Sequence, residues 1–278
     1  MRIVYLHQYF VTPSMAGGTR SYEMARRLVA KGHEVHMVTT DRAMGGDHRR
    51  GWRETIESGI SVHWAPVPYD NRMSYGERIK AFGRFAYQAS TLASRLRPDL
   101  VFATSTPLTI AIPAVIASRR AGCPMVFEVR DLWPAAPIAI GALGNPLLKA
   151  AARWLERFAY RNATRVVALA PGMKAEIVES GYPESHVAVI PNGCDLDLYG
   201  NVEGRSTRQR HPWLGDRPVL LFCGTFGLVN GVEYLARLAQ AIVQIDEEVR
   251  VVAIGTGREF DRVVALAREL GVYERNLY

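Results

Sequence analysis

The sequence predicts an α/β protein with two doubly wound domains, the second of them incomplete. Two observations predict this fold class. Short runs rich in β-branched residues alternate with longer helical patterns, which favours a mainly parallel sheet covered by helices on both faces. The same alternation restarts after a polar, basic stretch at residues 201–211, which indicates a second domain.

The first domain is expected to cover residues 1–195. Its strands are short apolar runs, expected at residues 2–6, 35–39, 62–65, 99–104, 125–129, 165–168 and 187–190. Helical patterns lie between most of them, at residues 19–31, 74–97, 108–121, 145–161 and 172–180. Alternating elements of these lengths predict a doubly wound domain.

The second domain is expected to cover residues 196–278. It has two strand patterns and two helical patterns, at residues 219–223, 232–245, 249–254 and 258–270. Two strand–helix units cannot cover both faces of a sheet, and residues 276–278 have the pattern of the beginning of another strand. We therefore expect the chain to be a fragment or a naturally truncated protein.

Composition narrows the function classes. Cys123, Cys194 and Cys223 are far apart, so they predict buried free thiols and not a disulfide framework or a CxxC motif.

Neither an export signal nor an apolar run of roughly 18 residues is visible, which predicts a cytoplasmic protein. The formal charge of +7 suits anionic lipid or phosphorylated molecules; nucleic acid is not expected, because no DNA- or RNA-binding motif accompanies the charge.

The loop after the first predicted strand is a candidate anion site. Gly17 and Gly18 precede a predicted helix, whose first N–H groups and positive dipole end attract anions. Arg20 in the first turn opposes that dipole, which favours a bound anion nearby. The alternative is a Gly-Gly turn capped by Thr19.

Two loops of the second domain have similar chemistry. Gly224, Thr225 and Gly227 follow one predicted strand, and Gly255 and Gly257 follow the next. A dinucleotide fingerprint would also need glycine at position 260, where the chain has phenylalanine, so a nicotinamide site is not expected. Three glycine-bearing loops that converge on a cleft suit a diphosphate.

Residues 130–134 place polar and aromatic groups directly beyond a predicted strand. Asp131 could orient a hydroxyl or accept a proton, Arg130 could bind phosphate, and Trp133 could stack on a sugar. The alternative has Asp131 capping the next turn and Trp133 in the core.

A basic stripe marks the predicted helix at residues 145–161. Its members recur every fourth residue and are Lys149, Arg153, Arg157 and Arg161. Such a stripe could face anionic lipid, with Trp154 and Phe158 on other faces of the helix. The alternative is a solvated basic surface.

Together these motifs resemble retaining glycosyltransferases of family 4, in the branch that builds bacterial surface polysaccharides. The matching segments are residues 7–10, 17–20, 32–35, 130–134, 190–195, 224–227 and 255–257. The Pro-Asn-Gly-x-Asp pattern that ends at Asp195 is the most specific of them.

The resemblance implies a GT-B fold and a nucleotide-sugar donor in an interdomain cleft, with no cofactor and no obligatory metal. It also implies a lipid-linked or saccharide acceptor and retention of anomeric configuration. Arg130 and Asp131 would be catalytic, with Asp131 orienting the acceptor hydroxyl. The donor and its diphosphate would be held by Gly17, Gly18, Arg20, Asn192, Gly193, Gly224, Thr225, Gly227, Gly255 and Gly257. The enzyme would work in the cytoplasm, or peripherally on the inner face of the cell membrane.

The chain also departs from the family's pattern. Ala135 stands where many members have a glutamate, and residues 228–230 stand where members often carry an arginine and a lysine. The family's paired-glutamate region would lie beyond Tyr278, so we expect the 278-residue chain alone to be inactive. Two alternatives are a nucleotide-sugar epimerase of the same architecture and a non-catalytic acceptor-binding subunit.

Overall fold

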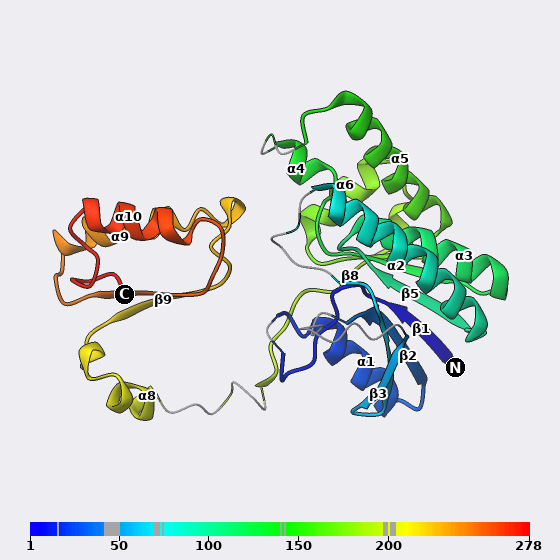
Figure 1. The fold of residues 1–278 in the computed structure, drawn as a ribbon, viewed down its shortest axis with the longest axis horizontal. Coiled ribbons are helices and arrows are strands. Elements are labelled where there is room, and N and C mark those ends of the chain that lie inside the picture. The colour runs from blue at the N-terminus through cyan, green and yellow to red at the C-terminus, as the bar shows by residue number, and fades with distance from the viewer. Residues whose placement is uncertain are drawn as a thin grey trace. The chain divides into compact units, whose positions relative to one another are not determined.

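The computed structural model describes residues 1–15, 17–41, 51–68, 73, 75–139, 141, 143–196, 200 and 204–278. The chain divides into two compact units, Met1–Gly193 and Cys194–Tyr278, where the sequence led us to expect a boundary between residues 195 and 196. Figure 1 shows a sheet with helices in each unit. Because the two units are not placed relative to one another, each is described by itself.

The first unit contains an eight-stranded sheet in the order β3-β4-β2-β1-β5-β6-β7-β8. Its strands are β1 (Arg2–Leu6), β2 (Glu34–Thr40), β3 (Arg53–Glu57), β4 (Ile60–Ala65), β5 (Leu100–Thr104), β6 (Met125–Val129), β7 (Arg165–Ala168) and β8 (Val187–Val189). Every pairing is parallel except that of β3 with β4. The predicted α/β class with a mainly parallel sheet is therefore confirmed.

Helices cover both faces of this sheet. They are α1 (Arg20–Ala30), α2 (Tyr75–Arg95), α3 (Ala111–Ala121), α4 (Ala135–Ala139), α5 (Pro146–Asn162) and α6 (Pro171–Glu179), with short 3-10 turns η1 (Leu108–Ile110) and η2 (Glu184–His186). Residue 74, where the second predicted helix begins, lies outside the described residues. The predicted helix at 108–121 is split, because η1 precedes α3.

Alternation along β1 separates two hydrophobic cores. Val4 and Leu6 belong to the cluster that contains Phe85 of α2, whereas Ile3 and Tyr5 belong to the cluster that contains Ala25 of α1. Successive side chains of a strand point to opposite faces, so these clusters lie on opposite sides of the sheet.

The register brings the carboxyl ends of the central strands together. Leu6 at the end of β1 pairs with Ala103 of β5, Ala103 pairs with Phe127 of β6, and Val129 of β6 pairs with Ala168 of β7. The loops that follow these strands therefore emerge along one edge of the sheet.

The second unit contains a parallel pair of strands, β9 (Val219–Cys223) and β10 (Arg250–Ile254). Its helices and turns are α8 (Gly204–Arg210), η3 (Pro212–Leu214), η4 (Leu228–Asn230), α9 (Glu233–Val243) and α10 (Phe260–Glu269). Helix α8 occupies most of the stretch at 201–211 to which the sequence assigned no element; residues 201–203 lie outside the described part of the chain.

The last residues pair with β10. The Tyr278 N–H donates to the Val251 carbonyl at 2.9 Å, and the Tyr278 carbonyl accepts from the Ala253 N–H at 2.8 Å. This is the geometry of a further parallel strand, as the pattern of residues 276–278 predicts.

Strand β9 of this small sheet is only partly covered. Leu221 of β9 is 61% exposed, although strands of doubly wound domains are normally buried on both faces. The incomplete cover expected from two strand–helix units is thus visible among the described residues.

Among the helices described here, none combines the length and the apolar character that crossing a bilayer requires.

Candidate functional site

A hollow of about 340 Å³ lies at the carboxyl edge of the first unit's sheet. The lining residues come from the loops after β1, β5, β6, β7 and β8 and from the turn before α1: His7, Tyr9, Gly17, Gly18, Thr106, Arg130, Asp131, Leu169 and Asn192. This edge is where open parallel sheets bind their ligands. The structure therefore brings five of the predicted site residues together within one unit.

Gly17 shapes the turn before α1. Its φ is +143°, a conformation that side chains disfavour, and a Cβ there would lie 3.2 Å from Val11 Cγ2. Next to it, a Cβ on Gly18 would lie 3.7 Å from Nη2 of Arg130, so the glycine turn runs close to a guanidinium. Thr19 makes no side-chain cap bond, which overturns the alternative of a Thr19-capped turn.

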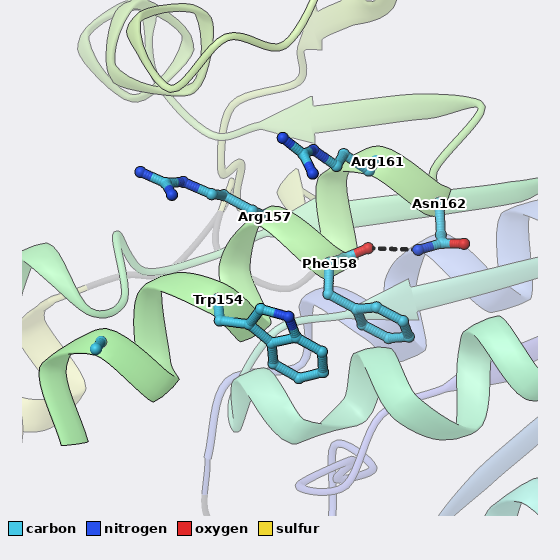
Figure 2. A pocket seen from close by; sticks show the side chains of 6 residues that line it. Trp154, Arg157, Phe158, Arg161 and Asn162 are labelled. Atoms are coloured by element: carbon cyan, nitrogen blue, oxygen red, sulfur yellow. Dashed lines mark hydrogen bonds between the residues drawn. The ribbon is translucent and has the colours of Figure 1, made fainter. Parts of the chain in front are cut away.

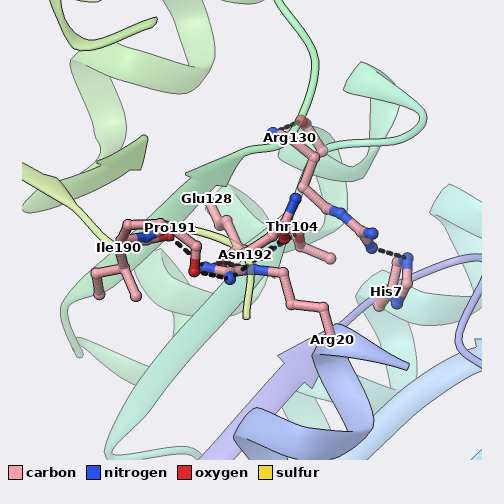
Figure 3. A network of polar contacts seen from close by, with 9 residues as sticks. His7, Arg20, Thr104, Glu128, Arg130, Ile190, Pro191 and Asn192 are labelled. Carbon is pink, nitrogen blue, oxygen red and sulfur yellow. Dashed lines mark hydrogen bonds and ion pairs between the residues drawn. The ribbon is translucent and has the colours of Figure 1, made fainter. Parts of the chain in front are cut away.

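Arg130 is held by hydrogen bonds at its backbone and at its guanidinium. Its backbone N–H donates to the Ser105 hydroxyl at 2.9 Å, and its Nη1 donates to His7 Nε2 at 3.3 Å (Figure 3). A guanidinium and the start of a helix both attract anions. This combination suits a phosphate group.

Asp131 and Trp133 are both exposed. The Trp133 side chain is 38% exposed, so the alternative that places it in the core is wrong. Asp131 lines the hollow, where its carboxylate can accept a hydrogen bond from a ligand hydroxyl. Its catalytic role stays a prediction.

Arg20 has a different environment from the one expected. Its Nε and Nη2 donate to Glu128 Oε1 at 3.0 and 2.9 Å, and the same Nη2 donates to the Ile190 carbonyl at 2.9 Å. Its Nη1 donates to the Pro191 carbonyl at 2.7 Å and to Asn192 Oδ1 at 3.4 Å (Figure 3). A guanidinium has five N–H donors, so all of them have partners within the protein. Direct binding of diphosphate by Arg20 stays a prediction, and these contacts do not favour it.

Glu128 lies next to the site, and no role was expected for it from the sequence. It is fully buried on β6, and its Oε2 accepts from the Thr104 hydroxyl at 2.6 Å. Burial, together with the nearby Glu128 charge, raises the pKa of the Tyr5 hydroxyl, so Tyr5 stays neutral. The available signal was a glutamate inside a buried strand pattern, because a buried carboxylate requires a partner.

Other lining residues were also missed. His7, Tyr9, Thr106 and Leu169 line the hollow but were assigned no role. Thr106 adopts a φ of +117°, an uncommon conformation for a β-branched residue that is often found at functional sites. Its place two residues after a buried strand was the available signal.

The two glycine loops of the second unit pack against each other. The Gly224 N–H donates to the Ile254 carbonyl at 3.0 Å, and the Phe226 N–H donates to the Thr256 carbonyl at 2.9 Å. A Cβ on Gly255 would lie 1.8 Å from the Gly224 carbonyl oxygen, so only glycine fits there. The structure thus brings together, within the second unit, the predicted donor residues Gly224, Thr225, Gly227, Gly255 and Gly257. Gly193 follows Asn192 and does not line the hollow of the first unit.

Helix α5 carries the predicted basic stripe. Asn145 caps its start by accepting from the N–H groups of Leu147 and Leu148, and the rings of Trp154 and Phe158 stack at 5.4 Å. A hollow of about 250 Å³ on this helix is lined by Ala150, Trp154, Arg157, Phe158, Arg161 and Asn162. In Figure 2 the two arginines extend away from the stacked rings, yet both kinds of side chain border this hollow.

Comparison with known proteins agrees with the geometry. The Glycosyl transferase 4-like domain family matches residues 16–193. An Escherichia coli (strain K12) protein named for colanic acid biosynthesis, the glycosyl transferase WcaI, is 22% identical over 276 residues, which cover 94% of this chain and 67% of that protein. The D-inositol 3-phosphate glycosyltransferase of Nocardiopsis dassonvillei is 25% identical over 272 residues, which cover 92% of this chain and 62% of that protein. The chain thus spans about two thirds of the length of these relatives.

Solved structures share the fold. The sucrose-phosphate synthase of Thermosynechococcus elongatus superposes with a TM-score of 0.73 at 15% identity, over 100% of this chain and 69% of that one. Anabaena Alr3699/HepE, solved in complex with UDP-glucose, superposes with a TM-score of 0.67 at 18% identity, over 100% of this chain and 68% of that one. These matches support the predicted GT-B-like fold.

Proposed function

The chain belongs to the Glycosyl transferase 4-like domain family, and from this premise we propose that it takes part in sugar transfer from a nucleotide-diphosphate sugar to a lipid-linked or saccharide acceptor. The transfer retains the configuration at the anomeric carbon and serves the synthesis of a bacterial surface polysaccharide such as O-antigen, capsule or exopolysaccharide. The hollow beside Gly18, Arg130 and Asp131 carries this proposal.

The leaving diphosphate needs donors and positive charge where its negative charge develops. Backbone N–H groups at Gly17 and Gly18 and the Arg130 guanidinium supply both from one edge of the sheet. Asp131 holds the acceptor hydroxyl by accepting its hydrogen bond, which orients the oxygen toward the anomeric carbon. Binding of UDP-glucose by the structural relative HepE supports a nucleotide-sugar donor.

We propose that transfer also needs groups outside these 278 residues. The chain spans about two thirds of its relatives' length, and Leu221 of β9 is exposed on a strand that doubly wound domains bury. The 278-residue chain alone is therefore expected to be inactive.

A sugar-transfer assay tests this proposal. Radiolabelled UDP-sugars and a polyprenyl-diphosphate-linked acceptor are offered to the 278-residue chain and to the polypeptide read in frame past Tyr278. We expect transfer with retention only by the longer polypeptide, and a large loss in its Asp131→Asn variant. Transfer by the 278-residue chain would refute the need for further groups, and epimerised donor without any acceptor would show an epimerase instead. A stop codon directly after Tyr278, with no transfer, would favour a non-catalytic acceptor-binding subunit.

We also propose that α5 holds the protein on an anionic membrane, at the inner face of the cell membrane. Arg153, Arg157 and Arg161 are exposed beside Trp154, which is 63% exposed, and Leu147 is exposed near the start of the helix. Basic residues with aromatic and aliphatic neighbours are the composition of interfacial helices. A lipid-linked acceptor would be met at this surface.

Vesicle sedimentation tests this membrane surface. Each basic residue near an anionic surface contributes about 1 kcal/mol, so replacing Arg153, Arg157 and Arg161 with serine should weaken binding to phosphatidylglycerol vesicles roughly 100-fold. The matched control replaces the same number of basic residues with serine in and just after α2, namely Arg84, Arg95 and Arg97. This control should bind the vesicles as the wild type does. Binding that ignores the anionic lipid content would contradict this part of the proposal.

A further inference from the structure

The buried ion pair between Arg20 and Glu128 joins three distant parts of the first unit. Arg20 begins α1, Glu128 lies on β6, and the carbonyls of Ile190 and Pro191 belong to the segment that follows β8. The Arg20 and Glu128 side chains are 10% and 0% exposed. Few charged groups are buried this deeply unless they are paired and hydrogen-bonded.

The partners of Arg20 define what it does. Two of its five hydrogen bonds go to Glu128, and three go to residues 190–192, the last residues before Gly193 ends the first unit. Glu128 is itself fixed by the Thr104 hydroxyl of β5. The segment that leaves the first unit is thus tied to the middle of its sheet by one side chain.

A direct role for Arg20 at a phosphate would need at least one of these bonds to break. Arg130, unlike Arg20, lines the hollow, and among the described residues its guanidinium makes one hydrogen bond, to His7. The two arginines therefore have different roles. Arg130 faces the hollow, whereas the hydrogen bonds of Arg20 go to groups of the protein.

We propose that Arg20 is a positioning residue whose buried pair with Glu128 fixes residues 190–192. This restraint places the Asn192 side chain on the rim of the hollow. It also sets the direction in which the chain leaves the first unit. The consequence for sugar transfer rests on the proposed function. The restraint itself exists without ligand and can be measured without it.

Backbone ¹⁵N order parameters of the ligand-free chain test the restraint. In the wild type, Asn192 and Gly193 should be rigid, with values near about 0.85, and release should bring them below about 0.6. Arg20→Lys keeps the charge but lacks the planar fork, so it cannot reach Glu128 and the carbonyls at once, and it should release the segment. Because a lone buried carboxylate can prevent folding, the double variant Arg20→Met/Glu128→Met removes both charges and should also release it.

The matched control is Arg53→Met, which breaks the half-buried pair of Arg53 with Asp41 elsewhere in the same unit. This variant should lower the melting temperature and leave Asn192 rigid. Wild-type order parameters in Arg20→Lys and in the double variant would overturn the proposal, as would an equal loss of order in the control. Failure of the sugar-transfer assay would leave this measurement unaffected, so the two proposals fail separately.

Discussion

At the residue scale, the sequence located polar groups better than it identified their partners. Arg130 was found from its place directly beyond a predicted strand, and Arg20 from its place in the first turn of a predicted helix. In the structure Arg130 lines the hollow, whereas Arg20 contacts Glu128 and residues 190–192. The counter-ion of Arg20 is 108 residues away in the chain, on a strand whose pattern is otherwise apolar. No local pattern shows such a pairing, because it depends on the order of the strands in the sheet.

Arg130 should contribute most of the affinity for a diphosphate. Hydrogen bonds to charged groups contribute about 1.5–3 kcal/mol, so Arg130→Ala should weaken binding of inorganic pyrophosphate roughly 10- to 150-fold in calorimetric titration. Arg84→Ala, an exposed arginine of α2, serves as the control for net charge. Equal affinities of the wild type and Arg130→Ala would remove Arg130 from the site.

His63 should make stability depend on pH. Burial lowers the pKa of His63 below its usual value of 6.5, although its hydrogen bond to Glu54 opposes this effect. The unfolded chain therefore binds more protons than the folded protein near pH 6, and this contribution to stability is lost as the pH falls through about 6.5. Thermal melting between pH 7.5 and 5.5 should show a steeper decline for the wild type than for His63→Gln. Parallel curves for the two proteins would contradict this assignment.

At the element scale, buried strands and long helices were predictable and exposed elements were not. Buried strands such as β1 and β6 begin and end where their apolar runs do. Strand β3 was missed because it is a polar edge strand, in which Ile56 is exposed, and its hairpin depends on the positive φ of Ser58 and Gly59. Helix α8 was missed because it is polar and has no buried residue.

The packing of the two second-unit loops gives a prediction for Gly255. A Cβ at this position would overlap the Gly224 carbonyl oxygen, so Gly255→Ala should destabilise the second unit by roughly 2–4 kcal/mol. Gly227→Ala is the matched control in the neighbouring loop, because its Cβ would meet only Thr225 Cγ2 at 3.8 Å. Urea denaturation followed by circular dichroism measures both. A similar small effect for the two variants would mean that the loops do not pack as described.

At the scale of the whole molecule, the chain's alternation of strands and helices correctly predicted the α/β class and the mainly parallel sheet. The family resemblance came from separate motifs, such as residues 17–20 and 190–195, and the match to the Glycosyl transferase 4-like domain family confirms it at the level of the family. The grouping of Gly18, Arg130 and Asn192 followed from the rule that parallel strands end at one edge. That the glycine loops of the second unit act on the same ligand stays a prediction.

A titration of the ligand-free chain with inorganic pyrophosphate, followed by backbone amide NMR, tests whether Gly17, Gly18 and Arg130 form one anion site. We expect saturable shifts at Gly17 and Gly18 that are lost in Arg130→Ala, because these groups border one hollow. Saturable shifts in the first unit that leave Gly17 and Gly18 unchanged, or no shifts in that unit at all, would contradict it.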